Sequence, residues 1–359
     1  MFIKNNLHLK EIKRFRVSEG RDLEKGLRLD RNEKVDLWPD DFISKVLSSK
    51  PKSFFSTYPE IYNLYKKISN FNNVNINQIL ITSGIDGSIK NLFSVLLKEN
   101  DNVGVFSPTY LMYKVYSSIY KVNCFQIGYS EDYKINNSEL EKFFTLNPKI
   151  LFVPNPNQPI ESSLSLLELK DLAVKCKAHN CFLVIDEAYY HLGSDTGISL
   201  IKDFENVIIL RTFSKAFGVP SIRTGFTISS EENMDIISKM RPAHEMNSVS
   251  IAIAEYLLDN IDMVMNYCEK IKNSRNLILK DLKNLGLNVR GQHGNYILIT
   301  FKSEEIAKNL VKFLKEELIY VKGPYLKPWN MCICFTVGPQ EYMKKFLSRM
   351  LEAKKEKIF

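Results

Sequence analysis

The chain has 359 residues and a formal net charge of +8; 45% of the residues are hydrophobic and 25% are charged. This composition excludes a disordered chain, and the length predicts one large and one smaller domain. The positive charge is spread over many lysines rather than gathered in one tail or stripe, so nucleic-acid binding is not expected.

No uninterrupted apolar run approaches the roughly 20 residues that a membrane span needs, and residues 1–14 lack the apolar core of a signal peptide. We therefore expect a cytoplasmic protein that does not enter a membrane. The six cysteines have neither a disulfide-framework spacing nor a zinc-site spacing, so reduced thiols and no metal are expected.

Short apolar runs alternate with helical patterns through the first two thirds of the chain. Helices are predicted at 85–97 and 166–179, and strands at 78–82, 103–107, 149–153, 181–185, 207–210 and 224–228. The strands are rich in Val, Ile and Phe, which is typical of strands buried on both faces. This alternation predicts an α/β fold with a mainly parallel sheet flanked by helices.

A different pattern begins near Pro242. Helices are predicted at 248–261, 263–285, 304–317 and 339–352, with strands at 296–301 and 332–337. We interpret the chain as an N-terminal arm (1–28), a large α/β domain (29–241) and a smaller α+β domain (242–359).

Candidate functional residues follow the predicted strands, where ligands bind in parallel sheets. Lys215 comes soon after strand 207–210, flanked by Ser214 and Arg223. Burial near other cations lowers the pKa of an amine and makes it nucleophilic, while an arginine fork suits a phosphate. Taken alone, a lysine in a loop is usually a solvated surface charge.

Three other strand ends carry polar or aromatic groups. Asp186 and Tyr189 follow strand 181–185, a Gly84 turn precedes the first predicted helix, and Tyr110 follows strand 103–107. They could pair with a ring nitrogen, bond a ring hydroxyl, bind a phosphate and stack on a flat heterocycle, respectively. Each also has a structural explanation: a helix N-terminus, an ordinary N-cap or a packing residue.

The ordered set of motifs resembles the fold-type I pyridoxal-phosphate (PLP) aminotransferases, and within them the histidinol-phosphate aminotransferase family. The resemblance runs from about Leu27 to Leu351. The segments that carry it are Leu29-Asp-Arg-Asn-Glu33, Thr57-Tyr58-Pro59, Ser83-Gly-Ile-Asp86, Pro108-Thr-Tyr110, Asp186-Glu-Ala-Tyr189, Ser214-Lys215 with Arg223, Gly294-Asn295-Tyr296 and Thr336-Val-Gly338.

The resemblance implies an aspartate-aminotransferase-like fold, PLP as cofactor, and a role for each matching residue. Lys215 would form the Schiff base and move the α-proton, Asp186 would keep the ring nitrogen protonated, and Tyr189 would bond the ring oxygen. The remaining implied cofactor contacts are stacking by Tyr110, phosphate binding by Ser214, Arg223 and the backbone of Ile85 and Asp86, and a phosphate contact from Tyr58 of a neighbouring subunit. That last contact implies a homodimer with shared active sites.

Three departures from the family pattern concern the substrate pocket. Gln158 replaces an asparagine that bonds the cofactor, Cys334 replaces an arginine that binds a substrate carboxylate or phosphate, and Lys322 replaces another substrate-binding arginine. Together with Asn32, Cys334 and Lys322 are the expected substrate-binding residues. Because all three departures touch the same pocket, the sequence favours altered specificity over neutral substitution.

The expected reaction is amino transfer from an amino-acid donor such as glutamate to a small phosphorylated ketone or aldehyde. The alternative is decarboxylation of an O-phosphorylated amino acid such as phosphoserine or phosphothreonine. A third hypothesis is a non-catalytic PLP-binding protein, against which the combination of Lys215, Asp186, Tyr189 and Arg223 argues.

Overall fold

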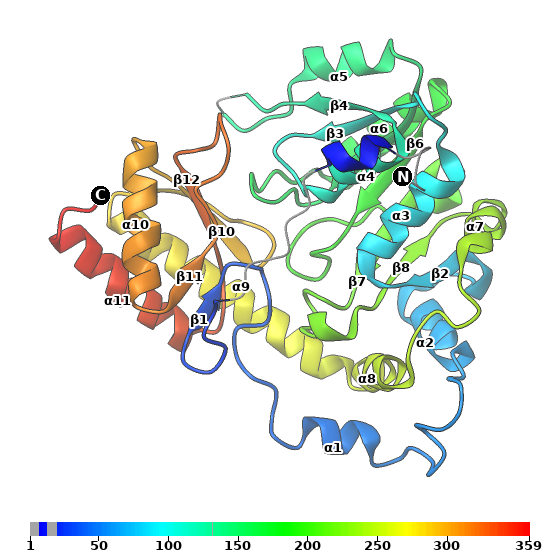
Figure 1. Cartoon of the computed structure of the whole chain (residues 1–359), viewed down its shortest axis with the longest axis horizontal. Coiled ribbons are helices and arrows are strands. Elements are labelled where there is room, and N and C mark those ends of the chain that lie inside the picture. Colours follow the sequence, from blue (N-terminus) through cyan, green and yellow to red (C-terminus); the bar gives the residue numbers. More distant parts are fainter. Residues whose placement is uncertain (1–6, 13–19, 131) are drawn as a thin grey trace.

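The computed structural model describes residues 7–12, 20–130 and 132–359 (Figure 1). Much of the predicted arm 1–28 therefore lies outside the described residues. Within the described ranges, each helix is too short or too polar to cross a lipid bilayer.

A seven-stranded sheet forms the centre of the larger part of the molecule, in the order β2-β8-β7-β6-β5-β3-β4. Its strands are β2 (Ile79–Thr82), β3 (Asn102–Phe106), β4 (Asn123–Ile127), β5 (Pro148–Pro154), β6 (Phe182–Asp186), β7 (Val207–Thr212) and β8 (Gly225–Ile228). Strand β8 runs antiparallel to both of its neighbours, and the remaining pairs are parallel. The prediction of a mainly parallel sheet is thus confirmed.

Helices cover both faces of this sheet because alternate strand residues point to opposite sides. Val184 and Ile208 belong to one buried cluster, whereas Leu183 and Ile185 belong to the other. The helices of this part are α1 (Phe42–Leu47), α2 (Tyr62–Asn72), α3 (Gly84–Leu96), α4 (Met112–Tyr120), α5 (Asn137–Phe144), α6 (Leu166–Ala178) and α7 (Glu231–Ile237). Two hydrophobic cores therefore hold one rigid sheet between them.

The C-terminal part contains a small antiparallel sheet packed against long helices, seen in yellow to red in Figure 1. The sheet has the order β12-β10-β9, with β9 (Asn288–Arg290), β10 (Tyr296–Thr300) and β12 (Cys332–Thr336). The helices of this part are α9 (Ile261–Asn284), α10 (Glu304–Glu316) and α11 (Gln340–Lys355), whereas α8 (Ser248–Asp259) precedes α9 and packs mainly on α1 and α2. The predicted α+β character of this part is confirmed.

The N-terminal segment crosses to the C-terminal part. Strand β1 (Leu27–Leu29) pairs in parallel with β11 (Ile319–Val321). Residues 30–33 follow directly and lie between the two parts of the molecule, beside the cavity described below. This crossing was not visible in the sequence, because a three-residue strand has no measurable periodicity.

Candidate active site

A cavity of about 830 Å³ lies at the carboxyl ends of the large sheet. The segments 30–33 and 321–323 complete its wall. Most of the predicted site residues line it: Asn32, Ile85, Asp86, Tyr110, Gln158, Asp186, Tyr189, Ser214, Lys215, Arg223 and Lys322. The structure therefore brings together residues that lie almost 300 positions apart in the chain.

The Lys215 amine is half-buried and held by two backbone carbonyls. Its Nζ donates to the oxygens of Arg31 at 2.9 Å and Asn32 at 3.2 Å. Burial, with the added repulsion of Lys322, lowers the pKa of Lys215 to about 8. A substantial fraction of the amine is thus neutral near physiological pH, as nucleophilic attack on an aldehyde requires.

The Asp186 carboxylate lies buried at the end of β6. It accepts hydrogen bonds from the Tyr113 hydroxyl at 2.5 Å and from the Ala188 N–H at 3.0 Å. Within the described residues no cationic side chain lies within ion-pair distance of it, and burial raises its pKa to about 6. A buried carboxylate in this state favours a cationic partner supplied by a ligand.

The Tyr189 hydroxyl accepts a hydrogen bond from Asn32 Nδ2 at 2.7 Å. In the described part of the chain its own hydrogen has no acceptor, so it is free to donate into the cavity. Asn32 is 6% exposed, and its other contacts reach the C-terminal part: its backbone N–H donates to Thr336 Oγ1 at 2.9 Å, and its carbonyl accepts from Asn295 at 3.2 Å. Asn32 is thus itself held by the C-terminal part and fixes the Tyr189 hydroxyl through one hydrogen bond.

The N-terminus of α3 forms the opposite end of the cavity. The side chain of its N-cap, Ser83, makes no capping hydrogen bond, so the first N–H groups of the helix are free to donate hydrogen bonds to an anion there. Gly84 has a φ of +71°, and a Cβ at this position would lie 2.9 Å from Arg223 Nη2. Only glycine therefore lets Arg223 approach the helix end so closely. Ser214 lines the same cavity.

Tyr110 lies beside this end, and its hydroxyl donates to Asp86 Oδ1 at 2.7 Å. The ring stands edge-on to Tyr113, with centroids 5.9 Å apart and an interplanar angle of 88°. The ring is thereby fixed from two directions, as a stacking platform needs to be.

The wall of the cavity around Gln158 consists of uncharged side chains, and the charged residues Lys322 and Arg31 line the cavity beyond it. Gln158 Nε2 donates to the Tyr325 hydroxyl at 3.2 Å and lies 3.7 Å from Cys334 Sγ. Cys334 is 1% exposed, and burial raises the pKa of its thiol to about 11, so it remains uncharged. Cys334 therefore contacts the cavity through Gln158 rather than lining it.

Tyr58 lies outside this cavity. It is 77% exposed and stacks on His244, with centroids 4.2 Å apart. Its predicted contact with the cofactor of a neighbouring subunit stays a prediction.

The sequence matches the family described as aminotransferase class I and II over residues 37–350. A histidinol-phosphate aminotransferase from Clostridium novyi is 31% identical over 313 residues, covering 85% of this chain and 86% of the relative. The chain belongs to the class I and II aminotransferases.

Solved structures of aminotransferases share this fold. The histidinol-phosphate aminotransferase of Sinorhizobium meliloti, solved with pyridoxal-5'-phosphate, superposes with a TM-score of 0.86 at 20% identity and 99% coverage of both chains. The L-threonine-O-3-phosphate decarboxylase of Porphyromonas gingivalis gives a TM-score of 0.75 at 18% identity, with 90% of this chain and 99% of that chain covered. These two likenesses concern the fold.

Pyridoxal phosphate is the cofactor of this aminotransferase family, and the residues present fit it. The unpaired carboxylate of Asp186 suits a cationic ring nitrogen, and the free hydroxyl hydrogen of Tyr189 suits an anionic ring oxygen. The uncapped end of α3 with Arg223 suits a phosphate, and the Lys215 amine suits an aldehyde.

Sequence reasoning missed two contacts of this aminotransferase site. Tyr113 holds Asp186, and Tyr325 holds Gln158. A signal existed for Tyr113, because it comes three residues after Tyr110, in the first turn of α4. No local signal marks Tyr325, which lies in an irregular loop.

Proposed function

We propose that this aminotransferase moves an amino group from an amino-acid donor such as glutamate to a small phosphorylated ketone or aldehyde, with a specificity that differs from that for histidinol phosphate. The observation that carries this proposal is the neutral end of the cavity. Where the family has an arginine, this chain has a buried, uncharged Cys334 covered by Gln158.

Lys322 and Arg31 both line this cavity. The Arg31 guanidinium lies 3.5 Å from Asp30, whereas Lys322 has no carboxylate within ion-pair distance among the described residues, and its Nζ lies 5.8 Å from the centre of the Tyr325 ring. An ammonium attracts a phosphate as a point charge, without the two parallel hydrogen bonds of a guanidinium. This arrangement supports a substrate with one compact anionic group at that end rather than two.

The chain's own residues would divide the chemistry as follows. PLP, when bound, supplies a conjugated ring that takes up the negative charge developing at the substrate carbon. Asp186 would hold the ring nitrogen protonated, and Tyr189 would donate its hydrogen to the ring oxygen. The Lys215 amine would take a proton from the substrate carbon and return it at another atom. Ser214, Arg223 and the N-terminus of α3 would hold the phosphate.

A homodimer is part of this proposal, as is the division of the chain at 28/29 and 241/242. Exposed aromatic side chains near the α2 N-terminus support the homodimer: Phe55 and Tyr58 are each 77% exposed and Tyr62 is 61% exposed. Large exposed apolar patches commonly mark protein interfaces. A second copy that covers this patch would bring Tyr58 toward the partner's phosphate site.

The neutral end also favours a second candidate, decarboxylation of an O-phosphorylated amino acid. A carboxylate placed against Gln158, which Tyr325 and Cys334 contact from behind, meets no guanidinium there, and poor solvation of its charge favours departure as neutral CO2. The cavity is the same; the bond that breaks is different.

One experiment separates these functions. The holoenzyme is given phosphoserine, phosphothreonine, histidinol phosphate and a panel of phosphorylated ketones with glutamate, and both CO2 and 2-oxoglutarate are measured. The proposal expects 2-oxoglutarate with a phosphorylated ketone and slower turnover of histidinol phosphate. CO2 release without any keto-acid acceptor would establish the second candidate, and fast turnover of histidinol phosphate would refute altered specificity.

A further inference from the structure

Glu161 occupies a backbone conformation that suits glycine. Its φ is +55°, in the left-handed region that side-chain-bearing residues rarely adopt. Residues 157–161 correspond to the motif Asn-Asn-Pro-Thr-Gly of the histidinol-phosphate aminotransferase family, which ends in glycine. Here a glutamate that is only 5% exposed takes the place of that glycine. Such an outlier persists where surrounding contacts fix it, and it directs attention to those contacts.

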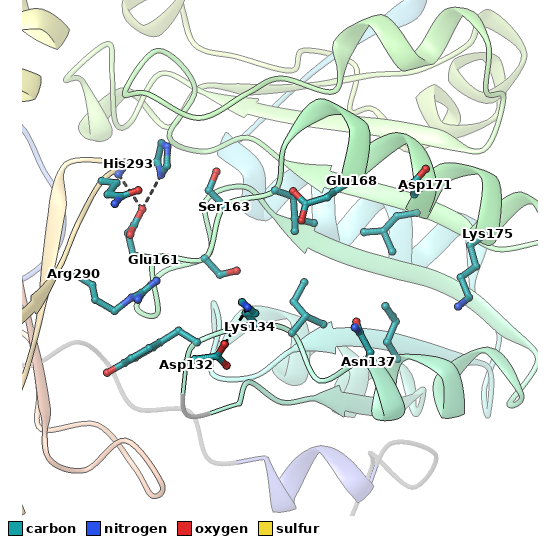
Figure 2. A pocket seen from close by; sticks show the side chains of 17 residues that line it. Asp132, Lys134, Asn137, Glu161, Ser163, Glu168, Asp171, Lys175, Arg290 and His293 are labelled. Atoms are coloured by element: carbon teal, nitrogen blue, oxygen red, sulfur yellow. Dashed lines mark hydrogen bonds and ion pairs between the residues drawn. The ribbon is translucent and has the colours of Figure 1, made fainter.

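The carboxylate of Glu161 contacts a turn of the C-terminal part, as Figure 2 shows. Its Oε1 accepts a hydrogen bond from the His293 backbone N–H at 2.9 Å and lies 2.8 Å from His293 Nδ1. Because a carboxylate accepts, Nδ1 carries the hydrogen. The buried guanidinium of Arg275 adds a favourable charge interaction with Glu161. One residue of the large-sheet part is thus bound to the turn between β9 and β10.

This contact belongs to the segment that carries Gln158. Within 157–161 the Glu161 N–H donates to the Asn157 carbonyl at 2.7 Å, so the segment forms a closed turn. A second bond crosses to the C-terminal part nearby, from the Tyr296 hydroxyl to the Asn157 carbonyl at 3.1 Å. Gln158 lies between these two attachment points and faces Tyr325 and Cys334.

A second cavity, of about 520 Å³, opens beside Glu161 and separates this junction from α6 (Figure 2). Its wall carries other charges, among them Arg290, which stacks on Tyr133, and the exposed Asp171 of α6. On this side, therefore, no close packing supports the contact between Glu161 and His293, which we call the tether. The hydrogen bonds of Glu161 thus contribute more to holding segment 157–161 at the turn.

We propose that Glu161 is a positioning residue: it ties segment 157–161 to the turn at His293 and thereby sets how Gln158 faces the substrate end of the active site. The tether itself is independent of the proposed function. Its kinetic consequence rests on that function, and the two are tested by separate measurements.

The tether is tested by amide hydrogen exchange on the full-length protein without substrate. Glu161→Gly removes the carboxylate and suits the backbone, whereas Glu161→Gln keeps the shape and an acceptor oxygen. Hydrogen bonds to charged groups are strong enough that exchange of 157–161 and 292–296 should rise by about tenfold or more in Glu161→Gly and less in Glu161→Gln. Asp171→Asn removes a charge from the same cavity wall and should leave both segments unchanged.

Protection of both segments in Glu161→Gly equal to that in Asp171→Asn would overturn the proposal. His293→Ala and the double variant Glu161→Gln/His293→Ala provide a second test. If the two side chains act as a pair, the double variant should exchange about as fast as the faster single variant. Multiplied effects in the double variant would show two independent roles and would also overturn it.

The kinetic consequence is tested by steady-state kinetics with the substrate identified in the panel of phosphorylated compounds. Since Glu161 acts through Gln158 and touches no reacting atom, Glu161→Gln should raise KM about fivefold and leave kcat within about twofold. A fall in kcat at constant KM would contradict a positioning role. Failure to find any substrate would bear on the proposed function and leave the exchange result to decide the tether.

Discussion

Replacing Asn32 should lower the free energy of unfolding and remove the hydrogen bond that positions the Tyr189 hydroxyl. Asn32→Gly removes the bond to the Tyr189 hydroxyl and that from Thr336 Oγ1 to Asn32 Oδ1 at 3.2 Å, whereas the bond from the backbone N–H at position 32 to Thr336 Oγ1 remains. Each lost hydrogen bond contributes about 1 kcal/mol, so the expected loss of unfolding free energy is about 2 kcal/mol. Asn32→Ala should lose about 1 kcal/mol more, because the φ of +53° is strained for alanine.

Urea unfolding of the two variants measures these losses directly. The order wild type, Asn32→Gly, Asn32→Ala in decreasing stability is the expected result. Equal midpoints for all three proteins would refute the reasoning, since neither the hydrogen bonds nor the backbone would then matter.

Asn32→Asp isolates the effect on the cofactor. An aspartate oxygen accepts rather than donates, so the Tyr189 hydrogen would turn to it and away from the ring oxygen. Loss of one such bond costs about 1.4 kcal/mol, which corresponds to about one pKa unit. The visible absorbance of the holoenzyme changes with pH, and the midpoint of this change should therefore rise by about one pH unit. Thr336→Val, which leaves the bond from Asn32 to Tyr189 in place, should reduce stability without moving that midpoint.

Three further predictions concern the rest of the cavity. Because only the neutral amine attacks, a Lys215 pKa of about 8 predicts that the rate of PLP binding to the apoenzyme rises about tenfold per pH unit below pH 8 and levels off above it. Stopped-flow absorbance measures this rate, and a midpoint near pH 10.5 would contradict the prediction. Lys322→Gln should raise KM for the phosphorylated substrate by about tenfold or more, while Lys322→Arg should retain or improve binding; steady-state kinetics decide. Gly84→Ala should weaken PLP binding by about tenfold, because the alanine Cβ displaces Arg223 and the positive φ is strained for alanine. Fluorescence titration measures this affinity. An unchanged affinity would show that PLP binding does not require Arg223 to lie so close to the N-terminus of α3.

The sequence was sufficient to predict the large sheet, because its strands are buried on both faces and bounded by turns. Each predicted strand lies within two residues of the observed one: 181–185 corresponds to β6 (Phe182–Asp186), for example. Strand β4 was missed. It lies at the edge of the sheet and is only partly buried, and the polar residues Asn123 and Gln126 leave it without a continuous apolar run.

That the predicted cofactor-binding residues would gather at one cavity was predictable, because most of them stand at or directly after the end of a strand of one sheet. The substrate end was not, because its geometry depends on contacts between distant segments. Gln158 reaches Tyr325, 167 positions away, and Glu161 reaches His293, 132 positions away. The family glycine at position 161 is compatible with a left-handed backbone, but nothing near Glu161 in the sequence indicates a buried carboxylate, since its burial depends on the fold around it.

The pairing of β1 with β11 has a consequence for engineering. The carbonyls that hold the Lys215 amine follow directly after β1, and β1 is aligned by a strand near the far end of the chain. The two ends of the polypeptide are therefore not exchangeable modules. A chimaera that takes its C-terminal third from a relative with another substrate should recover a working pocket only if residues 20–36 are transplanted from the same donor.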